Sequence, residues 1–173
     1  MSTNDILIKL QQESKLTCFL PRLRSYETDK RAMYILPSLN KWLTQDMKTT
    51  RMLNDQARVV SHLAEFIKGN RIDDLDFMKL LKPSESNIWA MRVRGSKPQY
   101  RVFGAFIDFD CFFGSHFVNR DDIEEKNSWE EEVNFVKKMW AKIFDNTSIQ
   151  RLSGSFQSLV SNGEERDKRK SKK

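Results

Sequence analysis

Cysteine and histidine are scarce in this sequence, which has 173 residues and only two of each. Cys18 and Cys111 lie far apart, and two distant thiols in a cytosolic chain are expected to stay reduced rather than to pair. Two cysteines and two histidines without ligand spacing also fail to supply the ligands of a tetrahedral metal site. We therefore expect no disulfide, no metal and no other cofactor.

Long apolar runs are lacking as well. No stretch approaches the ~20 apolar residues of a membrane-spanning helix, and residues 1–10 do not have the basic-then-apolar order of a signal peptide. Charged residues make up 31% of the chain and hydrophobic residues 39%, which is the balance of a folded globular protein. We expect a cytoplasmic protein without a membrane partner, built as one domain with extensions.

Basic residues outnumber acidic ones, which gives a formal net charge of +6. Residues 164–173 contain six Lys or Arg and three Asp or Glu, so this segment carries half of the excess. The remaining excess is small, and a basic binding site therefore requires cations that cluster in the folded chain. No segment pairs a Lys/Arg face with a wide apolar face as a membrane-surface helix does. Nucleic acid is therefore favoured over a membrane as the partner.

The centre of the chain has the composition of consecutive β-strands. Strand-like runs cover 88–94, 100–107 and 111–118, and turn-forming residues lie between them, at 95–99 and 108–110. This alternation predicts a three-stranded antiparallel meander.

Cations gather at one end of the predicted meander. In an antiparallel arrangement the end of the first strand, the start of the second and the end of the third meet at the same edge. We therefore expect five cations on one surface: Arg92, Arg94, Lys97, Arg101 and Arg120.

Apolar periodicity predicts helices on either side of the meander. A strand over 31–36 is followed by Pro37, which is favoured in a first helical turn, and two apolar stripes then predict a helical hairpin. The stripes are Leu39, Trp42, Leu43 and Met47, then Ala57, Val60, Leu63, Ala64 and Ile67 in a second helix capped by Asn54 or Asp55 and ended by Gly69. Ser128 and Glu131 have the spacing of a capping box, which predicts a helix from there to about Phe144.

The two ends of the chain are predicted to be extensions of a domain at 31–146. Residues 1–30 carry a helix signal at 1–14 and a strand signal at 16–20. We expect an added layer rather than a partner-binding arm, because apolar side chains there need burial: Leu7, Leu10, Cys18, Phe19 and Leu20. Residues 147–173 are expected to hold one more helix and then a disordered basic tail from residue 161.

The order of residues after Trp89 is distinctive. A tryptophan-containing strand ends in arginine, a glycine-containing turn precedes Tyr100-Arg101-Val102-Phe103, a strand closes with Asp108, and His116-Phe117-Val118 precedes polar residues and a helix. This order resembles the RelE/ParE superfamily of toxins, nearest to its HigB-like branch with phage-derived relatives, over roughly residues 36–144. The resemblance implies an α+β fold: a helical hairpin packed on one face of a small antiparallel sheet, made of the meander over 88–118 plus one earlier strand, and a C-terminal helix.

The resemblance implies the toxin of a type II toxin-antitoxin system, an endoribonuclease that cleaves messenger RNA, in many members at the ribosome. A ribose 2′-hydroxyl attacks its own 3′ phosphate, which requires a base, an acid and cations that hold the developing charge. By position, Arg101 matches the arginine of the family's Tyr-Arg pair and Arg120 its basic residue after the last strand. We expect both to be catalytic, assisted by Arg92. The implied protein partner is a cognate antitoxin. The implied assembly is a homo-oligomer or a hetero-oligomer with that antitoxin.

Other candidate residues have two interpretations each. His116 is the imidazole near the expected site, and its ordinary pKa of roughly 6.5 suits proton transfer; alternatively it is a strand histidine satisfied by a neighbour. Tyr100 either contacts RNA or is structural. The remaining expected RNA contacts are Arg94, Lys97, Lys82 and Asn119.

Phenylalanine is concentrated in the central hairpin, at positions 103, 106, 109, 112, 113 and 117. Such rings can stack on the bases of single-stranded RNA. The favoured alternative is core packing on both faces of the sheet, with the N-terminal extension covering the second face.

Two other functions remain open. One is a ParE-like inhibitor of DNA gyrase on the same fold, and the other is a non-enzymatic RNA-binding or adaptor protein that uses the toxin scaffold.

Overall fold

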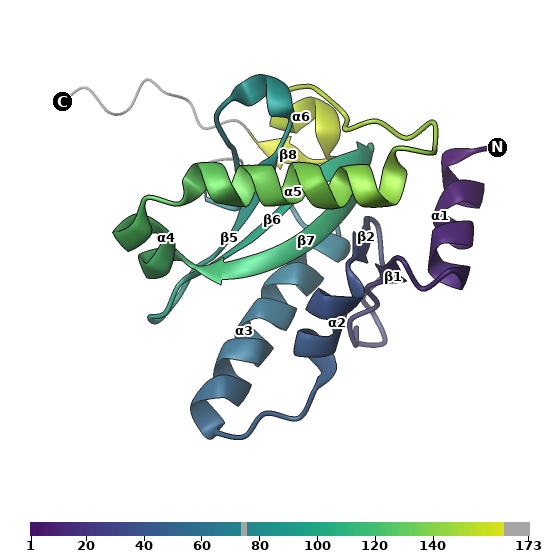
Figure 1. Cartoon of the computed structure of the whole chain (residues 1–173). Helices are drawn as coiled ribbons and strands as arrows, with labels where there is room; N and C mark the ends of the chain where they lie inside the picture. The colour runs from purple at the N-terminus through teal and green to yellow at the C-terminus, as the bar shows by residue number, and fades with distance from the viewer. Residues whose placement is uncertain (74–75, 165–173) are drawn as a thin grey trace.

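The computed structural model describes residues 1–73 and 76–164 and has an α+β fold, as expected (Figure 1). Its helices and strands follow in this order: α1 (Thr3–Gln12), β1 (Thr17–Cys18), β2 (Ala32–Ile35), α2 (Pro37–Thr44), α3 (Thr50–Ile67), β3 (Ile72–Asp73), β4 (Met78–Leu80), the 3-10 helix η1 (Ser84–Ser86), β5 (Trp89–Val93), β6 (Tyr100–Asp108), β7 (Cys111–Asn119), α4 (Arg120–Lys126), α5 (Trp129–Phe144), α6 (Phe156–Leu159) and β8 (Gly163–Glu164).

The central sheet has six strands in the order β1-β2-β7-β6-β5-β4. Strands β5, β6 and β7 pair antiparallel in sequence, but β2 pairs parallel with β7. The expectation of a small, wholly antiparallel sheet was therefore wrong. Met33, Tyr34 and Ile35 of β2 are all buried, and a strand buried on both faces is suited to an inner position beside a parallel neighbour. Separately, β3 and β8 form a short parallel pair.

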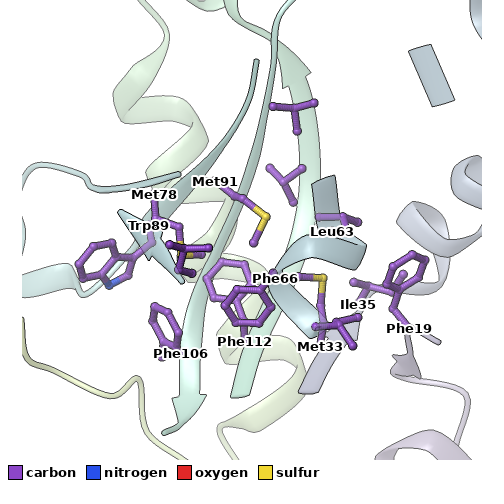
Figure 2. Close-up of a cluster of buried hydrophobic side chains, with 14 of the residues drawn as sticks. Phe19, Met33, Ile35, Leu63, Phe66, Met78, Trp89, Met91, Phe106 and Phe112 are labelled. Carbon is purple, nitrogen blue, oxygen red and sulfur yellow. The ribbon is translucent and has the colours of Figure 1, made fainter. Parts of the chain in front are cut away.

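One face of the sheet packs against α2 and α3. Phe66 of α3 meets Phe106 and Phe112 at ring-centroid distances of 6.4 and 6.1 Å, and Figure 2 shows these rings beside the methionines of the neighbouring strands. Gly104 makes this packing possible, because a Cβ there would collide with the carbonyl oxygen of Phe113 and crowd the Phe112 ring. The sheet also has a register irregularity at this glycine, which is the usual place for a bulge.

The opposite face of the sheet is covered mainly by α5, with α1 beside it (Figure 1). Phe113 packs edge-on against Trp140 and Phe144 of α5 at 5.7 and 5.6 Å. Helices therefore lie on both faces, whereas the resemblance implied one. The base-stacking interpretation is wrong for the fully buried rings, which are Phe103, Phe106, Phe112 and Phe113.

Two helix starts differ from the sequence-based expectation. Helix α3 begins at Thr50, where the Thr49 hydroxyl accepts a hydrogen bond from the Met52 N–H at 3.2 Å, so a cap at Asn54 or Asp55 was wrong. Helix α5 starts as predicted, but the Ser128 side chain makes no capping hydrogen bond. Its φ of −91° and ψ of 18° lie outside the extended conformation that directs a capping hydroxyl at the helix. The helical stripe of α2 is also shorter than predicted, because α2 ends before Met47.

The N-terminal segment packs onto the domain through α1 and β1. Leu7, Leu10 and Phe19 are buried, as expected, but Leu20 is 73% exposed. At the other end, the predicted further helix is reduced to α6, which buries Phe156 in the core.

The predicted disordered tail is only partly within the described residues. It was wrong for residues 161–164, which include β8 paired with β3, and the prediction for 165–173 lies outside the described residues. Among the helices of residues 1–73 and 76–164, none is both long enough and apolar enough to cross a membrane.

Two phenylalanines near the β6–β7 turn provide a test of the two-sided core. Phe106 is fully buried, whereas Phe109 is 52% exposed. We predict that Phe106→Ala lowers the free energy of unfolding by ~3–5 kcal/mol, because it leaves a cavity among aromatic rings. Phe109→Ala should change it by less than ~0.5 kcal/mol. Urea denaturation followed by circular dichroism measures both; equal losses in the two variants would contradict this packing.

Candidate functional site

A basic pocket of about 300 Å³ lies at the edge where β5 ends, β6 begins and β7 passes into α4. Its lining combines four arginines and a lysine with one carboxylate, one amide, an alanine and a tryptophan: Arg92, Arg94, Arg101, Arg120, Lys79, Glu124, Gln99, Ala90 and Trp129. The pocket therefore brings together four of the five cations that the sequence placed on one surface.

Strand alternation explains how these arginines converge. Successive side chains of a strand point to opposite faces, so Ala90 and Arg92 of β5 share one face of the sheet, and Arg94 follows directly after the strand. Arg92 lies directly opposite Arg101 of β6 in the antiparallel register. Like charges at directly opposed positions destabilise a sheet. The fold therefore keeps two arginines directly opposed at this edge, a position that favours a bound anion.

Arg101 is the central cation of the pocket and is only 7% exposed. One guanidinium nitrogen donates a hydrogen bond to the Tyr100 carbonyl oxygen at 3.0 Å. Within residues 1–73 and 76–164, no carboxylate lies within 4.0 Å of its side-chain nitrogens. Burial, and after it the positive charges of Arg120, Arg92 and Arg94, together lower the pKa of Arg101 to about 10. The site is therefore electrostatically prepared for a negative ligand.

Arg120 closes the pocket from α4, of which it is the first residue. Its backbone N–H donates to the Gln99 carbonyl oxygen at 2.7 Å, and its guanidinium lies 3.4 Å from a Glu124 carboxylate oxygen. These contacts join the β5–β6 loop to the start of α4. Asn119 caps this helix by accepting from the Asp121 N–H at 3.1 Å, so its side chain is engaged in the helix start.

The two remaining basic residues of the predicted surface lie further out. Arg94 lines the pocket and forms an ion pair with Asp76 at 2.7 Å. Lys97 is 84% exposed at the tip of the β5–β6 loop, 3.9 Å from Asp121, and does not line the pocket. Lys82 is also exposed, and it lines a neighbouring groove instead.

His116 does not line the pocket. Its ring stacks on Phe103 with a centroid distance of 5.1 Å, and its two nitrogens lie 2.7 Å from the Ser115 hydroxyl and 2.7 Å from a Glu132 carboxylate oxygen. Burial lowers the pKa of His116 from its ordinary value, and Glu132 opposes this shift. The second histidine, His62, is half-buried with its ring stacked on Phe77, and desolvation lowers its pKa to about 4.

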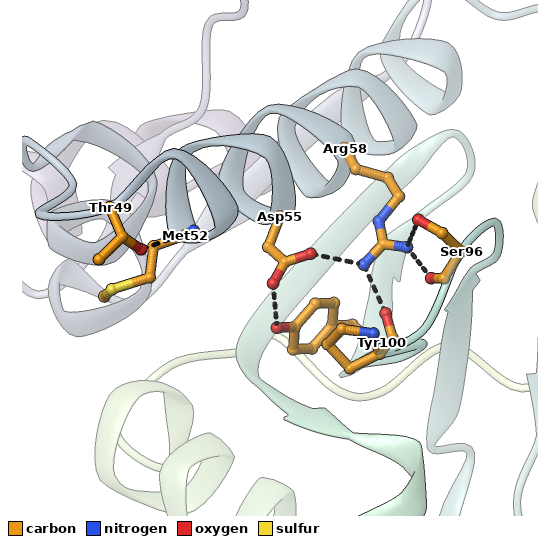
Figure 3. A network of polar contacts seen from close by, with 7 residues as sticks. Thr49, Met52, Asp55, Arg58, Ser96 and Tyr100 are labelled. Atoms are coloured by element: carbon orange, nitrogen blue, oxygen red, sulfur yellow. Dashed lines mark hydrogen bonds and ion pairs between the residues drawn. The ribbon is translucent and has the colours of Figure 1, made fainter.

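Tyr100 points to the opposite face of the sheet. Its hydroxyl donates to an Asp55 carboxylate oxygen at 3.2 Å, and the Arg58 guanidinium lies over its ring, 5.6 Å from the centroid. Arg58 also binds Asp55 and the carbonyl oxygens of Ser96 and Pro98 (Figure 3). Tyr100 thus belongs to a network that fastens the β5–β6 loop to α3, on the other side of the sheet from the pocket.

The sequence did not point to five of the pocket residues, which are Lys79, Ala90, Gln99, Glu124 and Trp129. Glu124 follows Arg120 by four positions, a spacing that faces two helical side chains toward each other. Lys79 required knowledge of the β4–β5 register, in which it lies opposite Ala90. No three His, Cys, Asp or Glu side chains of the described chain are grouped closely enough to hold a metal ion.

Comparisons with protein-family models, with curated proteins and with solved structures found no match for this chain. The chemistry of the pocket is therefore derived from its own geometry.

An anion that fills the pocket should stabilise the fold. We predict that pyrophosphate at 100 times its Kd raises the free energy of unfolding by ~2.7 kcal/mol and Tm by ~5–10 °C. Arg101→Gln should lose most of this shift, because it removes the buried cation. The exposed Arg22 supplies the matched control, Arg22→Gln, which should respond like the wild type. Thermal unfolding at fixed ionic strength measures the effect; an undiminished shift in Arg101→Gln would place the anion elsewhere.

Proposed function

We propose that the arginine pocket holds a phosphate of the RNA backbone and that the protein is an endoribonuclease toxin of the RelE/HigB-like kind. The observation that carries this proposal is Arg101, a buried cation surrounded by Arg92, Arg94 and Arg120. Arginine side chains bind phosphate bidentately and stay charged, which makes such a cluster suited to a phosphodiester.

The same cluster suits the transition state of RNA cleavage. When a 2′-hydroxyl attacks the neighbouring phosphorus, it gives up its proton, the bond from phosphorus to the 5′ oxygen breaks, and the leaving 5′ oxygen takes up a proton. Negative charge increases on the phosphate oxygens in the transition state. Cations held in position before the reaction stabilise that charge most strongly where water is excluded. Arg101 is buried and its neighbour Arg120 lies at the mouth of the pocket, on the exposed first turn of α4. Together they would hold the phosphate from two elements of the fold.

The arrangement of the chain supports the family assignment. Strand β2, the helices α2 and α3, the strands β5, β6 and β7, and then α5 follow one another in the order that the resemblance implies. The two arginines matched by position, Arg101 and Arg120, line one pocket. On this proposal the substrate is messenger RNA on the ribosome, and the partner is an antitoxin that covers the arginine pocket in the cytoplasm.

Glu124 is the carboxylate placed to remove the 2′ proton. It lines the pocket beside Arg120, whereas His116 contacts Ser115 and Glu132 outside it. A positioned carboxylate or imidazole contributes ~10²–10⁴-fold to such a reaction.

A second candidate function is RNA binding without cleavage. It is favoured by the position of His116, which leaves the imidazole proposed for proton transfer outside the phosphate pocket. Binding alone needs only the cations, and its affinity would fall steeply with salt because each phosphate contact releases counterions.

Cleavage is tested by inducing the wild-type chain in a bacterial host beside Arg101→Ala and Arg101→Ala/Arg120→Ala, with Arg22→Ala as the control. We predict growth arrest and new messenger RNA ends for the wild type and the control. Cleavage should fall ~10²-fold or more without Arg101, since transition-state stabilisation is lost. Growth curves and mapping of RNA 5′ ends supply the measurement.

Each failure of that experiment points to another function. Arrest without new ends would contradict the nuclease and favour gyrase inhibition, which should not depend on these arginines. Absence of arrest, together with salt-sensitive RNA binding that needs Arg101, would favour the non-enzymatic RNA-binding function.

Glu124 can be separated from the arginines by the step it affects. We predict that Glu124→Gln lowers the cleavage rate ~10²–10⁴-fold, because the variant removes the general base. RNA binding should be kept or strengthened, because the variant also removes a negative charge that repels the phosphate. Glu125 lies on the same short helix, is exposed and does not line the pocket, so Glu125→Gln is the matched control. Single-turnover cleavage and binding to uncleavable RNA measure the two effects; parallel losses in both would rule out a role in proton transfer.

A further inference from the structure

A second hollow adjoins the arginine pocket. This groove of about 730 Å³ runs between the segment after β4 and the start of α5, within the range of small-molecule sites. Both segments line it, with Lys82 and Glu85 on one side and Trp129 and Asn134 on the other.

Trp129 lines both the groove and the arginine pocket. It is the first residue of α5, is half-buried, and packs edge-on against the fully buried Phe103 with a centroid distance of 6.2 Å. The indole is therefore supported by the core from one direction while it forms a wall of two adjacent hollows. A ligand that spans the two hollows would contact this ring in both.

The groove differs from the pocket in charge. It carries two lysines, Lys82 and Lys137, and two acids, Glu85 and Glu130, so its formal charges balance. A group as anionic as phosphate gains little there. An uncharged ring with hydrogen-bonding edges fits better, because the groove offers an aromatic wall together with the side-chain amides of Asn127 and Asn134.

We propose that this groove is a nucleobase subsite. It takes the base of the nucleotide next to the phosphate that Arg101 holds, with the base stacked on Trp129 and its edge contacted by Asn134. The inference rests on the proposed function, since it assumes that the arginine pocket holds an RNA phosphate. Stacking on an aromatic side chain tolerates any base, and the amides add preference among bases.

The test compares a short 2′-O-methyl RNA, which cannot be cleaved by its own 2′-hydroxyls, with the same backbone carrying abasic positions. We expect the wild type to bind the base-containing probe at least ~10-fold more tightly than the abasic one. Trp129→Ala should reduce this ratio to about one, because it should weaken binding of the base-containing probe far more than binding of the abasic probe. Trp129→Phe should keep most of the ratio. Fluorescence anisotropy at constant salt measures all six affinities.

Asn134→Ala provides a second test in case Trp129→Ala does not fold. Asn134 is exposed and lies outside the core, so its replacement should not affect folding. It should change the order of affinities among probes of different base without changing the abasic affinity. Lys138→Ala is its control, an exposed residue of the same helix that does not line the groove.

The two levels of the inference fail differently. Equal binding of base-containing and abasic probes by the wild type, with both weakened by Arg101→Ala, would overturn the nucleobase subsite and leave the phosphate pocket standing. If Arg101→Ala leaves both probes bound as tightly as before, the phosphate pocket fails as well. A base-dependent ratio that survives Trp129→Ala would locate the base elsewhere.

Discussion

Burial of β6 and β7 on both faces is the constraint on which the rest of this structure depends. Phe106 and Phe112 face α3, while Phe103 and Phe113 face α5, and all are fully buried. Close packing of this kind leaves little freedom for the strands to shift. Because β6 is held in place and β5 pairs with it along its length, Arg92 of β5 stays opposite Arg101 despite the repulsion between them.

The opposed arginines at the sheet edge therefore contribute a local repulsion that does not stabilise the fold. Folded proteins tolerate such departures where a ligand compensates for them, and binding sites are accordingly less stable than the scaffold around them. Arg31 provides the contrast. It is an equally buried arginine, but it pairs with Asp110 at 3.1 Å and donates to backbone carbonyl oxygens. Arg31 therefore has a structural role, whereas Arg101 lines a pocket that can accept an anion.

The sequence predicted every strand of the central sheet except β4, and it predicted the convergence of Arg92, Arg94, Arg101 and Arg120, because a two-residue period and antiparallel geometry are local rules. It could not predict the parallel pairing of β2 with β7, which depends on a contact between distant segments. Trp129 was missed for the same reason, since its role follows from where α5 crosses the sheet. The cap of α3 was misplaced because Thr49, Asn54 and Asp55 are all competent caps by composition.

The segment after α5 has a consequence for the synthesis of the protein. The Leu152 N–H donates to the carbonyl oxygen of Phe106 at 2.9 Å, and Phe156, Leu159 and Val160 complete the core beneath α2 and α3. Domains fold as units while the chain emerges from the ribosome. Here the core stays incomplete until Phe156, Leu159 and Val160 have emerged, so the sheet that carries the arginine pocket reaches its final packing only once this segment is in place.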